Sequence, residues 1–450
     1  MDTQVHLNRT RLSILSLPRD KHWLFIGLIL RLLHQSTQGK TSEYSGYSDY
    51  EDAYRYERTT NHYESESSWS PISANTRILL TPSSDGLERM VDNLTKVVTS
   101  DSLSGLSRLS DDINSPQYDS DDDDEESYFF HVAYTPSECT VICSTILMNS
   151  LFEEPLKICK ELNYNDVKLL EETFLNLQVD SDGSLDKSAR IIELTKPLSE
   201  NKISLFFISS HFSDIVLIPY LLKDKVINIL TKKNFQFSDI SNSYIMHKNS
   251  SEPDTLDHEE NDKEEESTKK LDQDAFKLFK DADIEPRISN SIKLLLTGAR
   301  TGEVNNTIEK TTKVISANLI PLYFAITRTA LNEVSLVLPK STKKRSILGF
   351  DSRSIIGSTQ DIIIPITIDF SKLPLNATGI VAGLASRIIN GIKLFPDLIN
   401  YPFEMNYFSM ARSAVIMIPE ENIEVVSKVL DNLDHDPLKN DEICMNKLII

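Results

Sequence analysis

The sequence is short of positive charge and of long apolar runs, and each shortage excludes a class of protein. Its 450 residues hold 47 lysines and arginines against 67 aspartates and glutamates, a formal net charge of −20 at pH 7. An acidic chain repels phosphate backbones, so we expect no nucleic-acid binding. The apolar run Trp23–Leu30 is shorter than the roughly twenty residues that a membrane-spanning helix needs. We predict a buried helix there and no membrane span.

Cysteine is also scarce. The four cysteines are too few and too irregularly spaced for a disulfide-stabilised secreted domain, which favours a reducing compartment and a cytoplasmic location. Cys139 and Cys143 have the spacing of half a metal site, but no second cysteine pair supplies the remaining ligands. We therefore predict that both are side chains of a buried strand, and we predict no metal ion and no cofactor.

Signatures of catalysis are missing as well. The sequence has no nucleophile and base at motif spacing, no glycine-rich phosphate loop and no cluster of metal ligands. Thr297–Gly302 carries two glycines but lacks the lysine and the spacing of a P-loop, so it is predicted to be a simple turn between a strand and a helix. His211, in a predicted hairpin turn, is either a pH-sensitive ligand contact or a solvated side chain. We predict that the protein is not an enzyme.

Two acidic segments are too polar to fold by themselves. Residues 36–127 are rich in Ser, Tyr, Asp and Glu, and residues 249–270 are rich in Glu and Asp. Both are predicted to be disordered, because they bury too little apolar surface to offset the entropy of ordering. Ser120 precedes an acidic run and is either a phosphorylation site or part of a solvating segment. A shorter hydrophilic connector is predicted at Lys340–Arg345.

The clearest folded segment has the order strand, helix, hairpin, helix, strand. Alternating apolar residues predict a strand at Thr173–Val179, and apolar residues at helical spacing predict a helix from Leu185 to Leu198. A hairpin is expected at Ile203–Ile218, followed by a second helix and a short strand at Phe235–Phe237. This βαββαβ order is that of a ferredoxin-like unit.

The same order recurs, so we predict an α+β fold of about four tandem ferredoxin-like units. Other copies begin with strands at Ile362–Phe370, at Ser291–Leu296 and near Val5–Leu17. The predicted organisation is a first unit at 1–35 plus 128–172, an insert at 36–127, a second unit at 173–246, an acidic linker at 247–284, a third unit at 285–345, a fourth unit at 346–436 and a tail at 437–450.

Three stretches of the C-terminal unit carry a family resemblance: Gly379–Ala382, Tyr407–Ser409 and Ile418–Ile423. Together with the order of elements, they make the chain similar to ACT domains and, more narrowly, to the CASTOR family of amino-acid sensors. The resemblance implies a ligand between the second and fourth units, held by strand backbone and by a helix N-terminus, which favours a carboxylate. Carried over by position, the ligand-binding residues are Ser204, Leu205, Asn376, Ala377, Thr378, Gly379, Ile380, Val381, Ser409, Met410 and Ala414.

Two of these positions depart from the arginine-binding pattern of that family. The pattern has a glutamate where this chain has Ala377 and an aspartate where it has Ala414. Those acids would pair with an ammonium and a guanidinium, and a methyl group cannot replace such bonds. We therefore predict that arginine is not the ligand. Asp214, after the second unit's hairpin turn, is a candidate for a compensating acid, with a structural role as the alternative.

The resemblance implies a cytosolic, non-enzymatic sensor in which a bound amino acid changes the binding of a protein partner in the TOR pathway. Two alternatives stay open. One is an adaptor whose ACT surfaces bind protein partners without a small ligand. The other is a regulatory subunit of an enzyme of amino-acid metabolism. A homodimer is compatible with all three functions.

Overall fold

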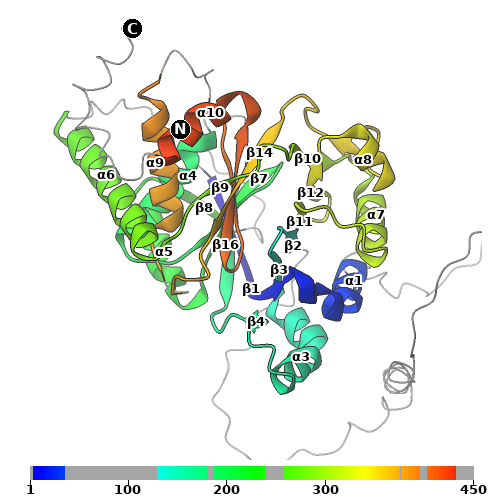
Figure 1. Cartoon of the computed structure of the whole chain (residues 1–450). Coiled ribbons are helices and arrows are strands. Elements are labelled where there is room, and N and C mark those ends of the chain that lie inside the picture. Colours follow the sequence, from blue (N-terminus) through cyan, green and yellow to red (C-terminus); the bar gives the residue numbers. More distant parts are fainter. Residues whose placement is uncertain are drawn as a thin grey trace, which may run out of the picture. The chain divides into compact units, whose positions relative to one another are not determined.

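Alternating apolar positions form the strands of this protein, and the amphipathic segments between them form its helices (Figure 1). The structure, a computed structural model, describes residues 4–35, 129–180, 187–239, 258–374, 377–395 and 403–431. All of these residues lie in one compact unit of the chain. They contain four repeats of a strand, a helix and a hairpin, which we call units 1 to 4 in chain order.

Units 1 and 2 both end with a helix and a short strand. Unit 1 contains β1 (Gln4–Pro18), η1 (Arg19–Phe25), α1 (Ile26–Gln35), β2 (Phe130–Tyr134), β3 (Glu138–Ser144), α3 (Thr145–Glu161) and β4 (Lys168–Leu169). Unit 2 contains β5 (Phe174–Asp180), α4 (Lys187–Glu200), β6 (Phe206–Ser209), β7 (Ser213–Pro219), η2 (Tyr220–Leu222), α5 (Lys223–Thr231) and β8 (Gln236–Asp239).

A long helix and a short strand, α6 (His258–Asp281) and β9 (Arg287–Ile288), precede unit 3. Unit 3 contains β10 (Leu294–Ala299), α7 (Val304–Ser316), β11 (Phe324–Ala330), β12 (Glu333–Pro339), α8 (Thr342–Ile347) and β13 (Ile355–Ile356). Unit 4 contains β14 (Ile363–Asp369), α9 (Ile380–Ile392), β15 (Asn406–Ser409), β16 (Ser413–Pro419), η4 (Glu420–Asn422) and α10 (Ile423–Asp431). The predicted fourfold order of strand, helix and hairpin is confirmed.

Strand pairing joins the units through equivalent edges. In units 1 and 3 the strands have the spatial order fourth, first, third, second, which is that of a ferredoxin-like sheet. The second strands of different units meet, because β2 pairs with β11 and β6 pairs with β15. Unit 1 therefore lies beside unit 3, and unit 2 lies beside unit 4. We call these two halves the 1–3 pair and the 2–4 pair.

The long strand β1 serves both pairs. Its residues Leu12–Pro18 pair with β3 of unit 1, and its earlier residues from Val5 pair with β5 and β8 of unit 2. On the other side, β10 meets β14 at Leu294 and Ile363, and β9 pairs with β14. The strand pairings therefore form a closed circuit. In this circuit β9 corresponds to the earlier half of β1, and β10 corresponds to its later half. Units 3 and 4 therefore repeat the arrangement of units 1 and 2.

Apolar side chains form one core cluster inside the closed circuit of strands and one under the helices of each pair. The inner cluster, inside the circuit, includes Leu12, Ile14, Ile142, Ile208, Ile215, Ala325, Phe408 and Met410. The outer cluster of the 2–4 pair includes Leu177, Val216, Phe279, Val381, Leu384, Tyr407, Ala414 and Val426. The corresponding cluster of the 1–3 pair includes Phe25, Ile29, Val141, Phe152, Ile308 and Leu336. The helices α4, α6, α9 and α10 cover one pair, and α1, α3 and α7 cover the other (Figure 1).

Two segments predicted to be irregular are helical. Residues 258–281 form α6, so the expectation of disorder is wrong for 258–270, and residues 342–347 form α8 where a hydrophilic connector was expected. α6 has a buried apolar side at Ala275, Phe276 and Phe279, which the acidic composition of the segment concealed. In α8, the buried Arg345 donates to the carbonyl oxygen of Pro339 at 3.2 Å. The predicted insert at 36–127, with Ser120, and the tail at 437–450 lie outside the described residues.

The apolar run near the N-terminus folds as expected in part. Phe25 and Ile29 are fully buried in the outer cluster of the 1–3 pair, but Trp23 is 61% exposed. In the part of the chain that the structure describes, every helix is too short or too polar to cross a bilayer. Cys139 and Cys143 are buried in β3, as predicted.

Candidate functional site

The seam between units 2 and 4 is where the predicted ligand residues of the two units approach each other. The Ser409 hydroxyl of β15 accepts a hydrogen bond from the Phe207 N–H of β6 at 2.9 Å. The Ser209 hydroxyl of β6 accepts one from the Tyr407 N–H of β15 at 3.1 Å. Ser209 and Ser409 have equivalent positions in their units, and so have Phe207 and Tyr407. The two bonds are therefore equivalent, and the seam has approximate twofold symmetry.

Several predicted residues surround one apolar cluster at this seam. Gly379 has a φ of 82° and lies at the N-cap of α9. Ala414 lies opposite Ser409 in the β15–β16 hairpin and is fully buried. Val381 and Ala414 belong to the outer cluster of the 2–4 pair, and Leu205 of unit 2 packs against the same cluster. Residues of two units, far apart in sequence, thus belong to one apolar cluster.

Other predicted residues are placed differently. Met410 belongs to the inner cluster, so its side chain lies on the face of the sheet opposite to that of Ala414. Ser204 and Leu205 precede β6, which begins at Phe206, rather than lying inside it. Asn376 lies outside the described residues. The half-buried residues where the chain enters α9 are Ala377, Thr378 and Ile380.

The position of Ala414 has an equivalent in unit 2, and the equivalent residue is Asp214. Asp214 lies opposite Ser209 in the β6–β7 hairpin, as Ala414 lies opposite Ser409. The Asp214 carboxylate accepts a hydrogen bond from Nε of Arg190 at 2.9 Å, and the two side chains are only 8% and 6% exposed. This bond supports the structural role of Asp214, because the carboxylate binds an arginine of its own unit.

α6 packs against the N-terminal half of α9. A Cβ added to Gly383 would lie 2.4 Å from the Cβ of Ala275 and 2.8 Å from the carbonyl oxygen of Leu271. Near this contact, Arg387 donates to the Asp272 carboxylate at 3.4 Å in a buried ion pair. These residues of α6 were not among the predicted site residues, although the spacing of the apolar residues between 271 and 279 could have indicated a packed helix.

Substitution of Gly383 tests this close approach. Gly383→Ala is expected to lower the free energy of unfolding by about 1–3 kcal/mol, because the added methyl group overlaps α6. Gly27 in α1 is the matched control, since no atom lies within 4 Å of a Cβ added there. Gly27→Ala is expected to raise stability by about 0.5–1 kcal/mol, because alanine favours a helix. Urea unfolding followed by circular dichroism measures both, and equal responses would contradict the close packing.

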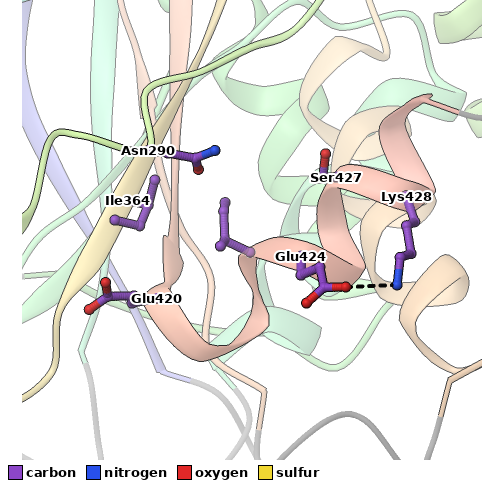
Figure 2. A pocket seen from close by; sticks show the side chains of 7 residues that line it. Asn290, Ile364, Glu420, Glu424, Ser427 and Lys428 are labelled. Atoms are coloured by element: carbon purple, nitrogen blue, oxygen red, sulfur yellow. Dashed lines mark hydrogen bonds and ion pairs between the residues drawn. The ribbon is translucent and has the colours of Figure 1, made fainter.

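A cavity of about 370 Å³ lies elsewhere in unit 4, beside α10 (Figure 2). Its lining residues are Asn290, Ile364, Glu420, Ile423, Glu424, Ser427 and Lys428. Figure 2 shows Lys428 bonded to Glu424, at 3.0 Å, and Glu420 forms an ion pair with Lys293. None of the predicted ligand residues lines this cavity. The cavity is therefore separate from the predicted site, and its carboxylates are paired with lysines of the chain.

Comparisons with known proteins identify the type of unit. Residues 169–232, from the end of β4 to the end of α5, match the ACT domain family. Among solved structures, the crystal structure of aspartate kinase from Synechocystis is similar at 9% identity over 68% of this chain, with a TM-score of 0.25. This chain spans only 50% of that structure. No curated protein matches the sequence. The fold is α+β, built from tandem ferredoxin-like units, of which unit 2 matches the ACT domain family.

Proposed function

We propose that the protein is a non-enzymatic regulator that binds an amino acid between units 2 and 4 and thereby changes its affinity for a protein partner. ACT domains bind amino acids for regulation, and the family match covers unit 2. The observation that carries the proposal is the seam, because it brings Leu205, the start of α9 and Ala414 to one cluster. By resemblance to the CASTOR family, the partner belongs to the TOR pathway and the location is the cytosol.

The start of α9 is suited to the carboxylate of an amino acid. Gly379, at the N-cap, provides no side chain that could accept a hydrogen bond from the first N–H groups of the helix. Such N–H groups, together with the helix dipole, favour an anion. A ligand that contacts both units changes the equilibrium between two arrangements only if it binds one of them more tightly. The seam offers this possibility, since its two sides belong to different units.

The chemistry around the seam favours a neutral or apolar amino acid over arginine. Ala377 and Ala414 supply no carboxylate, and the carboxylate of Asp214 is bonded to Arg190. A buried guanidinium without a carboxylate loses a contact worth about 2–4 kcal/mol, which corresponds to a complex about thirty- to several-hundred-fold weaker. We therefore expect no arginine binding at low micromolar affinity.

Calorimetric titration of the full chain tests this expectation. Ala414→Asp is expected to gain affinity for basic amino acids and to lose it for apolar ones, because an unpaired buried carboxylate is costly beside an apolar side chain. Ala377→Glu, at a half-buried position, is a second variant that restores an acid of the arginine-binding pattern. Low-micromolar arginine binding by the unmodified protein would refute the expectation. An Ala414→Asp variant with unchanged ligand preference would place Ala414 outside the site.

One observation favours a second function, that of an adaptor without a small ligand. α6 leaves no room for a methyl group at Gly383, and the Leu271 side chain lies 3.9 Å from a Cβ added to Gly379. A thermal-shift screen against the twenty amino acids separates the two functions, because a ligand that binds only the folded state raises the melting temperature. A shift with one or more amino acids supports the regulator. No shift with any of them supports the adaptor.

A further inference from the structure

The turn of the β15–β16 hairpin crosses from the 2–4 pair to the 1–3 pair. In this turn, the Ala411 N–H donates to the Thr140 hydroxyl at 3.1 Å, and the Arg412 N–H donates to the Glu138 carboxylate at 3.1 Å. The Ser413 hydroxyl donates to the other oxygen of Glu138 at 2.9 Å. The turn that leads into Ala414 is therefore bonded to β3 of unit 1.

Glu138 is a buried carboxylate that joins several elements. Besides the turn, it accepts hydrogen bonds from the hydroxyls of Ser16 in β1 and Thr140 in β3, each at 3.1 Å. Burial raises the pKa of Glu138, and these hydrogen bonds oppose the increase. Hydrogen bonds to an ionised carboxylate are about twice as strong as neutral ones. The carboxylate thus links two strands of unit 1 to a turn of unit 4.

The turn of the β6–β7 hairpin crosses to unit 3 in the equivalent way. The His211 N–H donates to the Ser335 hydroxyl of β12 at 2.9 Å. The His211 ring lies against Gly298 of β10, where an added Cβ would be 2.6 Å from ring atom Cδ2. His211 is half-buried, and its ring forms part of a packed contact between two units rather than standing free in solvent.

The two crossings differ in how the turn is held: in unit 2 the Phe212 N–H donates to the Ser210 hydroxyl at 3.3 Å, whereas in unit 4 the equivalent Arg412 N–H donates to a carboxylate of the other pair. Glu333 has the place in β12 that Glu138 has in β3, but it accepts a hydrogen bond from Thr329 of its own hairpin at 2.8 Å. Ser213, the equivalent of Ser413, has no hydrogen-bond partner for its hydroxyl among the described residues. Among the bonds of the described residues, the turn of unit 4 is held by a carboxylate from the other pair, and Glu333 bonds within its own hairpin.

We propose that Glu138 is a positioning residue for the amino-acid site of unit 4 and that it transmits ligand binding at the 2–4 seam to the 1–3 pair. The inference rests on the proposed function, since it takes Ser409 and Ala414 as ligand contacts. These two residues flank the turn that Glu138 holds. A shift of the hairpin on ligand binding must either move β3 with it or break the bonds to Glu138. Among the described residues, the equivalent Glu333 bonds within its own hairpin, so the coupling is assigned to the hairpin of unit 4.

Hydrogen–deuterium exchange of the full chain without ligand tests the positioning role. Glu138→Gln keeps the size of the side chain but replaces one acceptor oxygen with an amide NH₂ group. It is expected to increase exchange of the amides at 410–413 about tenfold and to leave those at 210–213 unchanged. Glu333→Gln is the matched control and should not affect residues 410–413. Unchanged exchange at 410–413 in Glu138→Gln would overturn the proposal.

The coupling to ligand is tested with an equimolar mixture of the twenty amino acids as the probe. Binding is followed by the rise in melting temperature and by the decrease of exchange at 409–414. In Glu138→Gln the apparent affinity for the mixture is expected to fall about 5–150-fold, the usual range of a coupling between sites. Glu333→Gln should keep the affinity. Thr140→Val, which removes the acceptor of the Ala411 N–H, should act in the same direction, with Ser335→Ala as its control.

The outcomes separate this proposal from the proposed function. If the mixture affects neither the melting temperature nor the exchange of the unmodified chain, the amino-acid function fails and the coupling fails with it. If the unmodified chain and Glu138→Gln respond equally to the mixture, amino-acid binding stands and the role of Glu138 is overturned. Equal losses in Glu138→Gln and Glu333→Gln would indicate general destabilisation and would also overturn it.

Discussion

Asp214→Ala is expected to lower the free energy of unfolding by about 3–5 kcal/mol, because it removes a buried carboxylate that pairs with the guanidinium of Arg190. Both side chains are less than a tenth exposed, and the hydrogen bond between them measures 2.9 Å. A charge in such a place cannot be rehydrated without opening the contact between α4 and β7. The loss should therefore be much larger than for an ion pair at the surface.

Two further variants show whether breaking this ion pair causes the loss of stability. The double variant Arg190→Met with Asp214→Ala removes both charges and should be more stable than Asp214→Ala alone. Glu309→Ala breaks the pair with Lys313, whose side chains are 62% and 72% exposed, and should change stability by less than about 0.5 kcal/mol. Denaturant unfolding at pH 7 measures all three. A cost below about 1 kcal/mol for Asp214→Ala would contradict the buried pair.

Acidification from pH 7 to pH 4.5 is expected to remove about 2–3 kcal/mol of stability through His131 alone. Burial lowers the pKa of His131 to about 3, whereas an unfolded histidine has a pKa of about 6.5. Below pH 6.5 the unfolded chain takes up a proton that the folded chain does not. The contribution of His131 to stability is therefore complete above its pKa in the unfolded chain. It falls by about 1.4 kcal/mol per pH unit as the pH decreases toward its pKa in the folded chain.

His131→Asn isolates this effect. The Nδ1 atom of His131 lies 2.8 Å from the Thr327 hydroxyl, a contact that an asparagine can keep without a group that titrates in this range. Urea unfolding of both proteins at pH 7 and pH 4.5 should show a smaller loss in the variant. The effect of Glu138 on the pH dependence of stability has the opposite sign, because its raised pKa adds stability as the pH falls. This effect is the same in both proteins. Exposed His34→Asn is the control, and a pH response as large in His131→Asn as in the unmodified chain would refute the assignment.

The periodic parts of the fold could be predicted from the sequence because their signal is local. The strand expected at Ile362–Phe370 is β14 (Ile363–Asp369), and the strand expected at Thr173–Val179 is β5 (Phe174–Asp180). In both strands nearly every position is buried or half-buried, and the recurring apolar residues mark the strand in the sequence. The four hairpins and the helices before them follow from the same signal.

The joints between units could not be predicted, because their partners are far apart in the chain. The seam of the 2–4 pair depends on bonds between residues about two hundred positions apart, such as Phe207 and Ser409. Glu138 and Ser413 are separated by 275 positions, and nothing near Glu138 in the sequence marks a buried carboxylate. α6 was missed for another reason, since acidic residues outnumber the few apolar ones that pack. Of the candidate site, the residues around Ala414 were predictable only through the family resemblance.

The double pairing of β1 has a consequence for biosynthesis. β1 is translated before every strand that it pairs with, and the last of them, β8, ends at Asp239. At ribosomal rates of about 5–20 residues per second, the strand waits roughly 10–40 seconds for that partner. Residues 36–128 lengthen this interval, because they separate α1 from β2. A nascent chain with an apolar strand unpaired for so long is a substrate for chaperones bound at the ribosome, and its folding is slow because its contacts are non-local.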